Sequence, residues 1–138
     1  MKQFMKYDAG FSPLPIDDGD EIFRNGIFEF NISKLYKWLG SGNSAITITE
    51  VEIADYYREF SSINDSHVDS VDLDKPVILA EISPGRYNLI DGNHRVEKAR
   101  RKGINSLPCY RVNAALHVRF LTNKSAYIKY VEYWNDKA

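Results

Sequence analysis

The alternation of hydrophobic and polar positions along the chain predicts several short strands. Residues 23–32, FRNGIFEFNI, contain an Asn-Gly turn signal, after which Phe28, Phe30 and Ile32 alternate with Glu29 and Asn31. This order is typical of a hairpin that leads into a half-buried strand. Short apolar runs bounded by turn residues predict further strands. They lie at residues 77–82, 87–90 and 107–112.

Helical spacing of apolar residues predicts three or four helices. We expect them at residues 33–39, 49–60 and 94–102, and from about residue 125 onward. Ser33 is the expected N-cap of the first. Thr49 and Glu52 fit a capping box that would open the second. Gly103 stands where a C′ glycine would end the third. Strands and helices in this mixture predict an α+β fold with a small, partly curled, mixed β-sheet.

The chain length favours a single domain over residues 1–138. Residues 1–20 include Pro13, Pro15 and an acidic group, which predicts an irregular arm or a short edge strand. Residues 26–112 form the expected core, and residues 61–75 within it are polar and aperiodic, as in a loop. Residues 113–138 are expected to give a loop, a short strand and the last helix.

Composition narrows the cellular setting. No apolar run approaches the roughly 18 residues of a membrane span, and the first ten residues lack the apolar stretch of a secretory signal. Cys109 is the single cysteine and lies in an apolar strand, so it has no internal disulfide partner. We therefore expect a cytoplasmic, reducing environment without membrane association.

Charge is distributed unevenly although the net charge is only −1. Residues 1–75 contain 7 Lys/Arg and 14 Asp/Glu, whereas residues 76–138 contain 11 and 5. The basic half favours an anionic ligand, and the alternative is that the two halves neutralise each other on packing. A pI near 6.3 and the lack of a basic tail argue against nucleic acid as the partner. A small anionic ligand is the better fit.

The segment that carries most chemistry is the turn between the strand 87–90 and the helix 94–102. Asp91, Gly92 and Asn93 break the strand, and His94 and Arg95 follow in the first helical turn. The first amides of a helix lack intrahelical partners and bear partial positive charge, and glycine lets an anion approach closely. An imidazole and a guanidinium beside them favour phosphate. The alternative is that this turn only caps the helix.

A wider motif surrounds this turn. It consists of PVILA at 76–80, GRYNLIDGNHR at 85–95, Ala99, Gly103 and Leu-Pro at 107–108. The motif resembles the signature of the ParB/sulfiredoxin-like superfamily, specifically over residues 76–112 and more loosely from residue 28. The resemblance implies a nucleotide-phosphate pocket more firmly than one reaction. ParB proteins bind and hydrolyse CTP, sulfiredoxins phosphorylate a sulfinic acid, and a free-serine kinase has a similar D-G-x-H-R turn.

Departures from that signature narrow the implied chemistry. Asn93 stands where sulfiredoxins carry their reactive cysteine, which argues against sulfiredoxin activity. His94 stands where ParB proteins generally carry arginine. ParB proteins continue into a helix-turn-helix domain and a dimerisation domain, for which the 26 residues after Val112 are too few, so an intact partitioning protein is not expected.

Three hypotheses follow, of which phosphate or nucleotide binding is the leading one. In the first, the domain binds a phosphate or a nucleotide, the latter with Mg²⁺. Gly92 and Asn93 supply amides, His94 and Arg95 contact phosphate oxygens, and Asp91 orients His94 or a Mg²⁺-bound water. In the second, the chain is a phosphotransferase or nucleotide hydrolase in which His94 or Asp91 is the base and Arg95 stabilises charge on the phosphoryl group.

The third hypothesis is a non-catalytic interaction module. Tyr127, Tyr130, Val131 and Trp134 recur at helical spacing and form one stripe. Such a stripe is usually core, but at this place it could also cover the pocket, recruit a protein partner or form a homodimer contact.

Other groups carry weaker signals. The loop 40–44, GSGNS, resembles a phosphate-binding loop in composition only. Glu50 or Glu52 could match the glutamate base of the serine-kinase relatives, although capping explains Glu52 without chemistry. His67, between Asp65 and Asp69, has potential metal-ligand neighbours, but no fourth ligand is apparent and we predict no metal site there.

Overall fold

The architecture comes from a computed structural model that describes residues 3–42, 44, 46–56 and 65–138. Within these residues lie six strands, five α-helices and two single-turn 3-10 helices. In chain order they are β1 (Ile22–Asn25), β2 (Phe28–Asn31), α1 (Ile32–Gly40), β3 (Thr49–Glu52), η1 (Ile53–Asp55), α2 (Asp65–Ser70), β4 (Val77–Ser83), β5 (Arg86–Asp91), α3 (Asn93–Arg101), β6 (Ser106–Val112), α4 (Ala114–His117), η2 (Val118–Phe120) and α5 (Lys124–Lys137).

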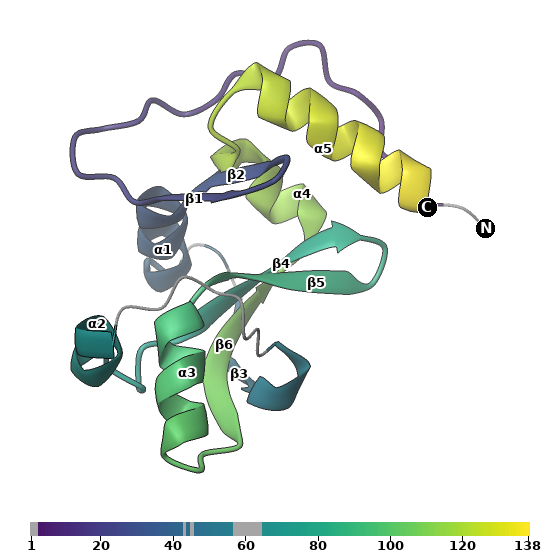
Figure 1. The fold of residues 1–138 in the computed structure, drawn as a ribbon. Coiled ribbons are helices and arrows are strands. Elements are labelled where there is room, and N and C mark those ends of the chain that lie inside the picture. The colour runs from purple at the N-terminus through teal and green to yellow at the C-terminus, as the bar shows by residue number, and fades with distance from the viewer. Residues whose placement is uncertain (1–2, 43, 45, 57–64) are drawn as a thin grey trace.

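The strands form two sheets (Figure 1). Strands β1 and β2 pair as the predicted hairpin, with Gly26 in its turn at a φ of 60°. The other four strands follow the order β3-β6-β4-β5, in which β4 and β6 are parallel and the other neighbours antiparallel. The α+β class and the mixed sheet are confirmed. The expected single sheet is wrong, because Phe30 of β2 forms a bridge to Leu121 and β2 pairs with no strand of the main sheet in the described residues.

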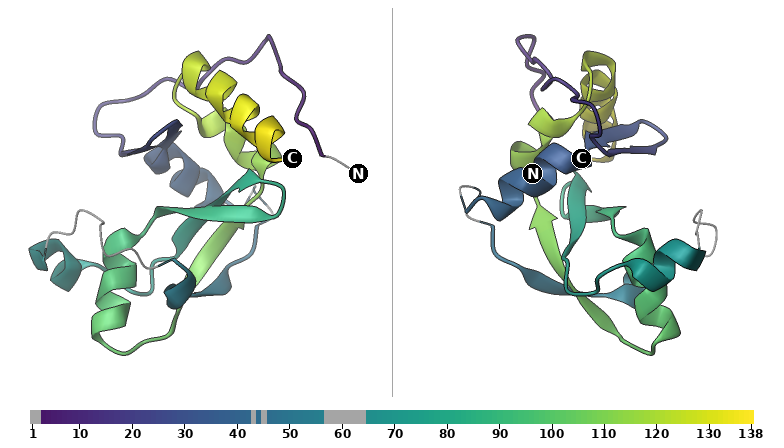
Figure 2. Two further views of the ribbon diagram at one scale, coloured as in Figure 1. Left: turned by 45° about the vertical axis from the view of Figure 1, so that its right-hand side comes forward. Right: turned by 90° about the vertical axis from the view of Figure 1, so that its left-hand side faces the viewer.

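Alternate residues of β4 point to opposite faces of the main sheet, and each face carries its own core. Ile78, Ala80 and Ile82 pack with α1, the hairpin, α4 and α5, whereas Val77 and Leu79 pack with α3 and β3. The views agree that the first and last parts of the chain gather on one side of the sheet and α3 on the other (Figures 1 and 2). The larger core thus joins segments from both ends of the sequence.

The helix expected at residues 49–60 is wrong as far as residue 56. Thr49–Glu52 form strand β3, antiparallel to β6 with Thr49 opposite Cys109, and the short turn η1 follows. Only Val51 of the strand is buried, and β3 lies at an edge of the main sheet. The capping box indicates only a local preference for helix. The pairing of this segment with β6 stabilises the strand more than that preference stabilises a helix. Residues 57–60 lie outside the described residues.

The loop expected at residues 61–75 is interrupted by helix α2. Val68 is its single buried residue, at 1% exposure. The Lys98 ammonium of α3 donates to the carbonyls of Asp69 and Val71. These contacts come from a distant part of the sequence, so the polar composition of the segment did not reveal them. Residues 61–64 lie outside the described residues.

Three smaller expectations are corrected. The short strand expected within residues 113–121 is helical (α4 and η2), because the Asn113 side chain caps α4 by accepting from the Leu116 amide. The N-cap of α1 is Asn31, which accepts from the Lys34 amide, and Ser33 instead accepts from the Glu21 amide. The helix total of five exceeds the three or four expected.

The N-terminal arm is irregular up to β1, as expected, and lies along α5 (Figures 1 and 2). Helix α5 itself confirms the predicted C-terminal helix. In the part of the chain that the structure describes, every helix is too short or too polar to cross a bilayer.

Candidate functional site

The turn before α3 depends on Gly92. This residue holds the N-cap position with a φ of 123°, a conformation that side chains strongly disfavour. A Cβ there would lie 2.4 Å from Cγ1 of Val77 and 2.8 Å from its Cβ. The turn therefore packs directly on the start of β4. Because the N-cap residue is a glycine, no N-cap side chain satisfies the first amides of α3, and the simple capping interpretation of Asp91 and Asn93 is wrong.

The guanidinium of Arg95 is bonded to other groups of the protein. Its side chain is only 7% exposed. Nη1 donates to the carbonyls of Lys75 and Pro76, both at 2.8 Å, and Nη2 donates to Oδ2 of Asp91 at 2.6 Å. In this arrangement Arg95 does not present the bidentate fork that we expected it to offer a phosphate. The carboxylate of Asp91 is bonded to Arg95. This contact gives no support to the expected roles of Asp91 as a base or as the group that orients His94.

The Arg95 contacts help to clamp residues 75 and 76 against the turn. The Tyr36 hydroxyl of α1 also donates to the Pro76 carbonyl. Burial raises the pKa of Tyr36 to about 12, so its hydroxyl stays protonated and remains a donor. The Lys75 ammonium lies 4.4 Å from the centre of the Tyr36 ring, a cation–π distance. This network fixes the position of a lysine beside the turn.

A cavity of about 530 Å³ opens on the turn. It is bounded by the whole turn, by Lys75, by the last part of α2 and the segment after it, and by one residue next to β1. The lining residues are Glu21, His67, Ser70, Val71, Asp72, Lys75, Asp91, Gly92, Asn93, His94 and Arg95. All five residues expected at the site therefore border a single space, although the side chain of Arg95 is turned to internal partners.

His67 is one of the residues that sequence reasoning did not bring to this site. Its ring meets that of His94 edge to face, with centroids 4.5 Å apart and an interplanar angle of 88°. Partial burial, and secondly the neighbouring His67, lower the pKa of His94, so His94 is neutral at neutral pH. Asp65, which precedes His67 in the sequence, pairs with Arg101 at 2.7 Å. Val68 is the one buried residue of α2, and this apolar residue in a polar segment was the sequence signal that the segment packs against the protein.

The weaker candidates lie away from the cavity. Glu50 and Glu52 are exposed on β3, which is at the opposite edge of the main sheet from β5. A role as general base at the turn is therefore excluded for both. The described residues of the loop 40–44 do not line the cavity either.

The aromatic stripe of α5 belongs to the core. Tyr127, Tyr130, Val131 and Trp134 are 0–6% exposed and pack in the larger cluster. The stripe does not line the cavity, and its burial includes contacts with the N-terminal arm, since Phe11 stacks on Tyr127.

The residues present do not build a metal site by themselves. Among the described residues, no three His, Cys, Asp or Glu side chains gather in a way that could hold a metal ion. A Mg²⁺ ion in such a place would be held mainly by the phosphates that accompany it. We derive no step through a metal.

Comparison with known proteins adds no assignment: the chain matches no family model, no curated protein and no solved structure.

Proposed function

We propose that this protein binds a phosphate group, free or as part of a nucleotide, in the cavity at the N-terminus of α3. The proposal includes membership of the ParB/sulfiredoxin-like superfamily, which the motif of residues 76–112 resembles. It also includes a reducing, cytoplasmic environment. This part is supported by the sequence, in which the fully buried Cys109 is the single cysteine.

One observation carries the proposal. The cavity of about 530 Å³ borders the N-terminus of α3, whose N-cap residue is Gly92, next to the imidazoles of His67 and His94 and the ammonium group of Lys75. Its volume falls within the roughly 300–1,000 Å³ of small-molecule sites. The amides of Asn93 and His94 are at the start of a nine-residue helix, where partial positive charge accumulates. Lys75 supplies a full positive charge.

Arg95 takes a different role in this proposal from the one its motif suggests. Its ion pair with Asp91 neutralises one of the three carboxylates that line the cavity, and its bonds to two carbonyls hold Lys75 at the rim. Arg95 is therefore a positioning residue. The direct contacts to phosphate oxygens come from main-chain amides, His94 and Lys75.

Binding of an anion should strengthen in mild acid. Partial burial holds the pKa of His94 below its ordinary value. A phosphate beside the ring favours the imidazolium and raises that pKa, so ligand binding takes up a proton. Affinity should therefore rise as the pH falls toward 6, as long as the fold persists.

The neutral His94 imidazole also favours a second candidate, a nucleotide hydrolase or small phosphotransferase. In that reaction His94 takes the proton from the attacking water or hydroxyl, and the helix amides stabilise the charge of the phosphoryl oxygens. Asp91 has no comparable support as the base, because its carboxylate is bonded to Arg95.

The test is ligand titration, by calorimetry and thermal shift, with inorganic phosphate, nucleoside triphosphates and nucleoside diphosphates, each with and without Mg²⁺. At a concentration 100 times its Kd, a true ligand stabilises the fold by about 2.7 kcal/mol. His94→Ala and Lys75→Gln should each weaken binding about tenfold or more, since a charged hydrogen bond contributes roughly 1.5–3 kcal/mol.

Lys102→Gln is the matched control, because it removes the same charge from the exposed C-terminal end of α3. The proposal fails if no compound in the panel shifts the melting temperature, or if Lys102→Gln weakens binding as much as Lys75→Gln. Phosphate release that depends on His94 would establish the hydrolase, and binding without release would identify a sensor.

A further inference from the structure

The N-terminal arm is held on α5 through its main chain. The Asn135 side chain accepts from the Met5 amide at 2.6 Å and donates to the Met5 carbonyl at 3.0 Å. The Trp134 indole donates to the Gln3 carbonyl at 2.6 Å. These bonds join residues about 130 positions apart in the sequence. Each of them could be made equally well by the same arm reaching over from a second copy.

A second set of contacts holds the arm at Tyr127. The hydroxyl of Tyr127 accepts from the Asp8 amide at 2.8 Å, and its ring stacks on Phe11 with centroids 4.1 Å apart and an interplanar angle of 7°. Residues 3–11 therefore form a docked segment with defined partners on a single helix.

The docked segment does not fill the groove in which it lies. A cavity of about 580 Å³ remains between the arm and the body, lined by Phe4 and Met5 on one side and by Ala115 and Val118 of the α4–η2 region on the other. Incomplete packing lowers the cost of lifting a segment locally without unfolding the rest.

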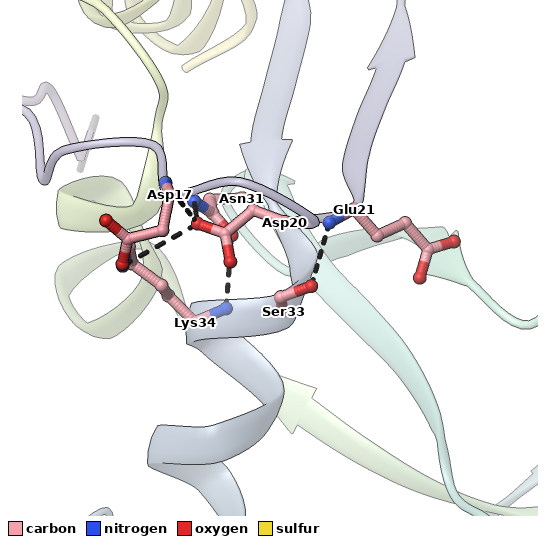
Figure 3. Close-up of polar contacts among 6 residues, drawn as sticks. All are labelled: Asp17, Asp20, Glu21, Asn31, Ser33 and Lys34. Atoms are coloured by element: carbon pink, nitrogen blue, oxygen red, sulfur yellow. Dashed lines mark hydrogen bonds and ion pairs between the residues drawn. The ribbon is translucent and has the colours of Figure 1, made fainter.

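The far end of the arm is anchored independently. Asp20 accepts from the Asn31 side chain at 2.9 Å, and Asp17 pairs with the Lys34 ammonium of α1 (Figure 3). The Glu21 amide donates to Ser33 at 2.8 Å (Figure 3). Between the docked segment and this anchor lies only the hinge 12–16, SPLPI. Fully extended, five residues span at most about 18 Å.

We propose that residues 3–11 exchange between two copies of this chain, so that each arm docks on α5 of its partner. The hinge is short, and its prolines restrict it to extended conformations. Short, stiff hinges favour exchange, and exchange is a low-cost route to a dimer because every docking bond of the closed form is kept.

Exposed apolar side chains add a gain that exists only in the dimer. Of the six large hydrophobic residues exposed in the described part of the chain, four lie on the arm: Phe4, Tyr7, Leu14 and Ile16, at 62%, 42%, 39% and 51%. An arm that crosses between two bodies brings these side chains against the second copy, and their burial favours association.

The first measurement is the mass in solution by light scattering, across a hundredfold range of concentration. We expect about twice the chain mass of 15.9 kDa.

The second measurement uses the double variant Met5→Cys with Asn135→Cys, oxidised and run on a non-reducing gel. Exchanged arms give a covalent dimer, whereas an arm docked on its own chain gives a cyclised monomer. Cys109 is fully buried and does not interfere.

The control places the second thiol one position along α5. Met5→Cys with Asp136→Cys, in which residue 136 is exposed, should give much less of the crosslinked dimer. Four glycine and serine residues inserted after Leu14 relax the hinge and should weaken dimerisation tenfold or more. A monomer at every concentration, a cyclised monomer from the first double variant, or a lack of any crosslink between positions 5 and 135 would each overturn the proposal.

Discussion

The two faces of the main sheet differ in both composition and role. On one face, the larger core gathers all the buried Phe, Tyr and Trp residues of the described chain, and the fully buried His117 packs against two of them. On the other, the buried cluster around Val96 and Leu79 is small and contains no buried aromatic residue among those described. The candidate cavity borders this second face. The first face supplies most of the apolar burial, while the second carries polar groups whose positions depend on a few specific bonds.

This contrast makes the cavity side sensitive to single polar substitutions. A large apolar core tolerates changes that preserve volume, whereas a buried ion pair does not tolerate the loss of one partner. Three substitutions or conditions test the comparison, in decreasing order of expected effect.

The largest effect is expected from Arg95→Met. The substitution keeps much of the side-chain volume but removes the donor of Asp91 and of the Lys75 carbonyl, while the Pro76 carbonyl keeps only the Tyr36 hydroxyl of its two side-chain donors. We expect a loss of about 3–5 kcal/mol in the free energy of unfolding, measured by chemical denaturation. Arg86→Met, at an exposed position of β5, should stay within about 0.5 kcal/mol of wild type. A loss below about 1 kcal/mol for Arg95→Met would contradict the positioning role.

The second largest effect is expected from Gly92→Ala. The new methyl group meets Val77 at 2.4 Å in a backbone conformation with a φ of 123°, so strain and overpacking combine. We expect a destabilisation of about 3 kcal/mol. Gly85→Ala is the matched control, because Gly85 also has a positive φ, 74°, but open space around its Cβ. Its cost should be about 1 kcal/mol. Equal costs at the two positions would show that close packing on β4 is unimportant.

The smallest expected effect is the loss of stability in acid that His117 causes on the face of the sheet that carries the larger core. Burial lowers the pKa of His117 to about 4, from an ordinary value of 6.5. The folded protein therefore stays neutral at this site where the unfolded chain takes up a proton, and stability is lost as the pH falls from 6.5 toward 4. Between pH 7.5 and 5 the loss should be about 2 kcal/mol from this residue.

His117→Gln provides the check, since a glutamine amide can still donate to the Glu81 carbonyl that Nε2 of His117 contacts at 2.6 Å. Denaturation curves from pH 7.5 to 5 should lose most of their slope with pH in this variant. The rest of the slope comes partly from His94, whose pKa is also lowered. An unchanged slope would mean that acid sensitivity does not arise from the larger core. Acid thus weakens one face of the sheet while it strengthens anion binding at the other.

Segments with strong local signals were predicted well from the sequence. The turn residues Asn25 and Gly26 gave the first hairpin, and helix α3 begins within one residue of its expected start and ends one residue before its expected end. The last helix was also recognised from its spacing. In each case the preference lies within a few consecutive residues, so no distant partner is needed to choose the structure.

Segments whose structure depends on distant partners were not predicted. Thr49 and Glu52 satisfy a helix signal, yet β6 offers that segment an edge to pair with. His67 reaches His94 only because α2 packs on α3.

By itself the sequence determined the strand–turn–helix unit around Gly92 and the chemistry of the five residues that border the cavity. The tertiary structure alone decided what those residues contact. It turned Arg95 inward to Asp91 and two carbonyls, and it brought His67 and Lys75 to the rim. The physical reason is that local backbone preferences act between neighbours in the chain, whereas the partners of a buried charge are set by which distant segments pack around it.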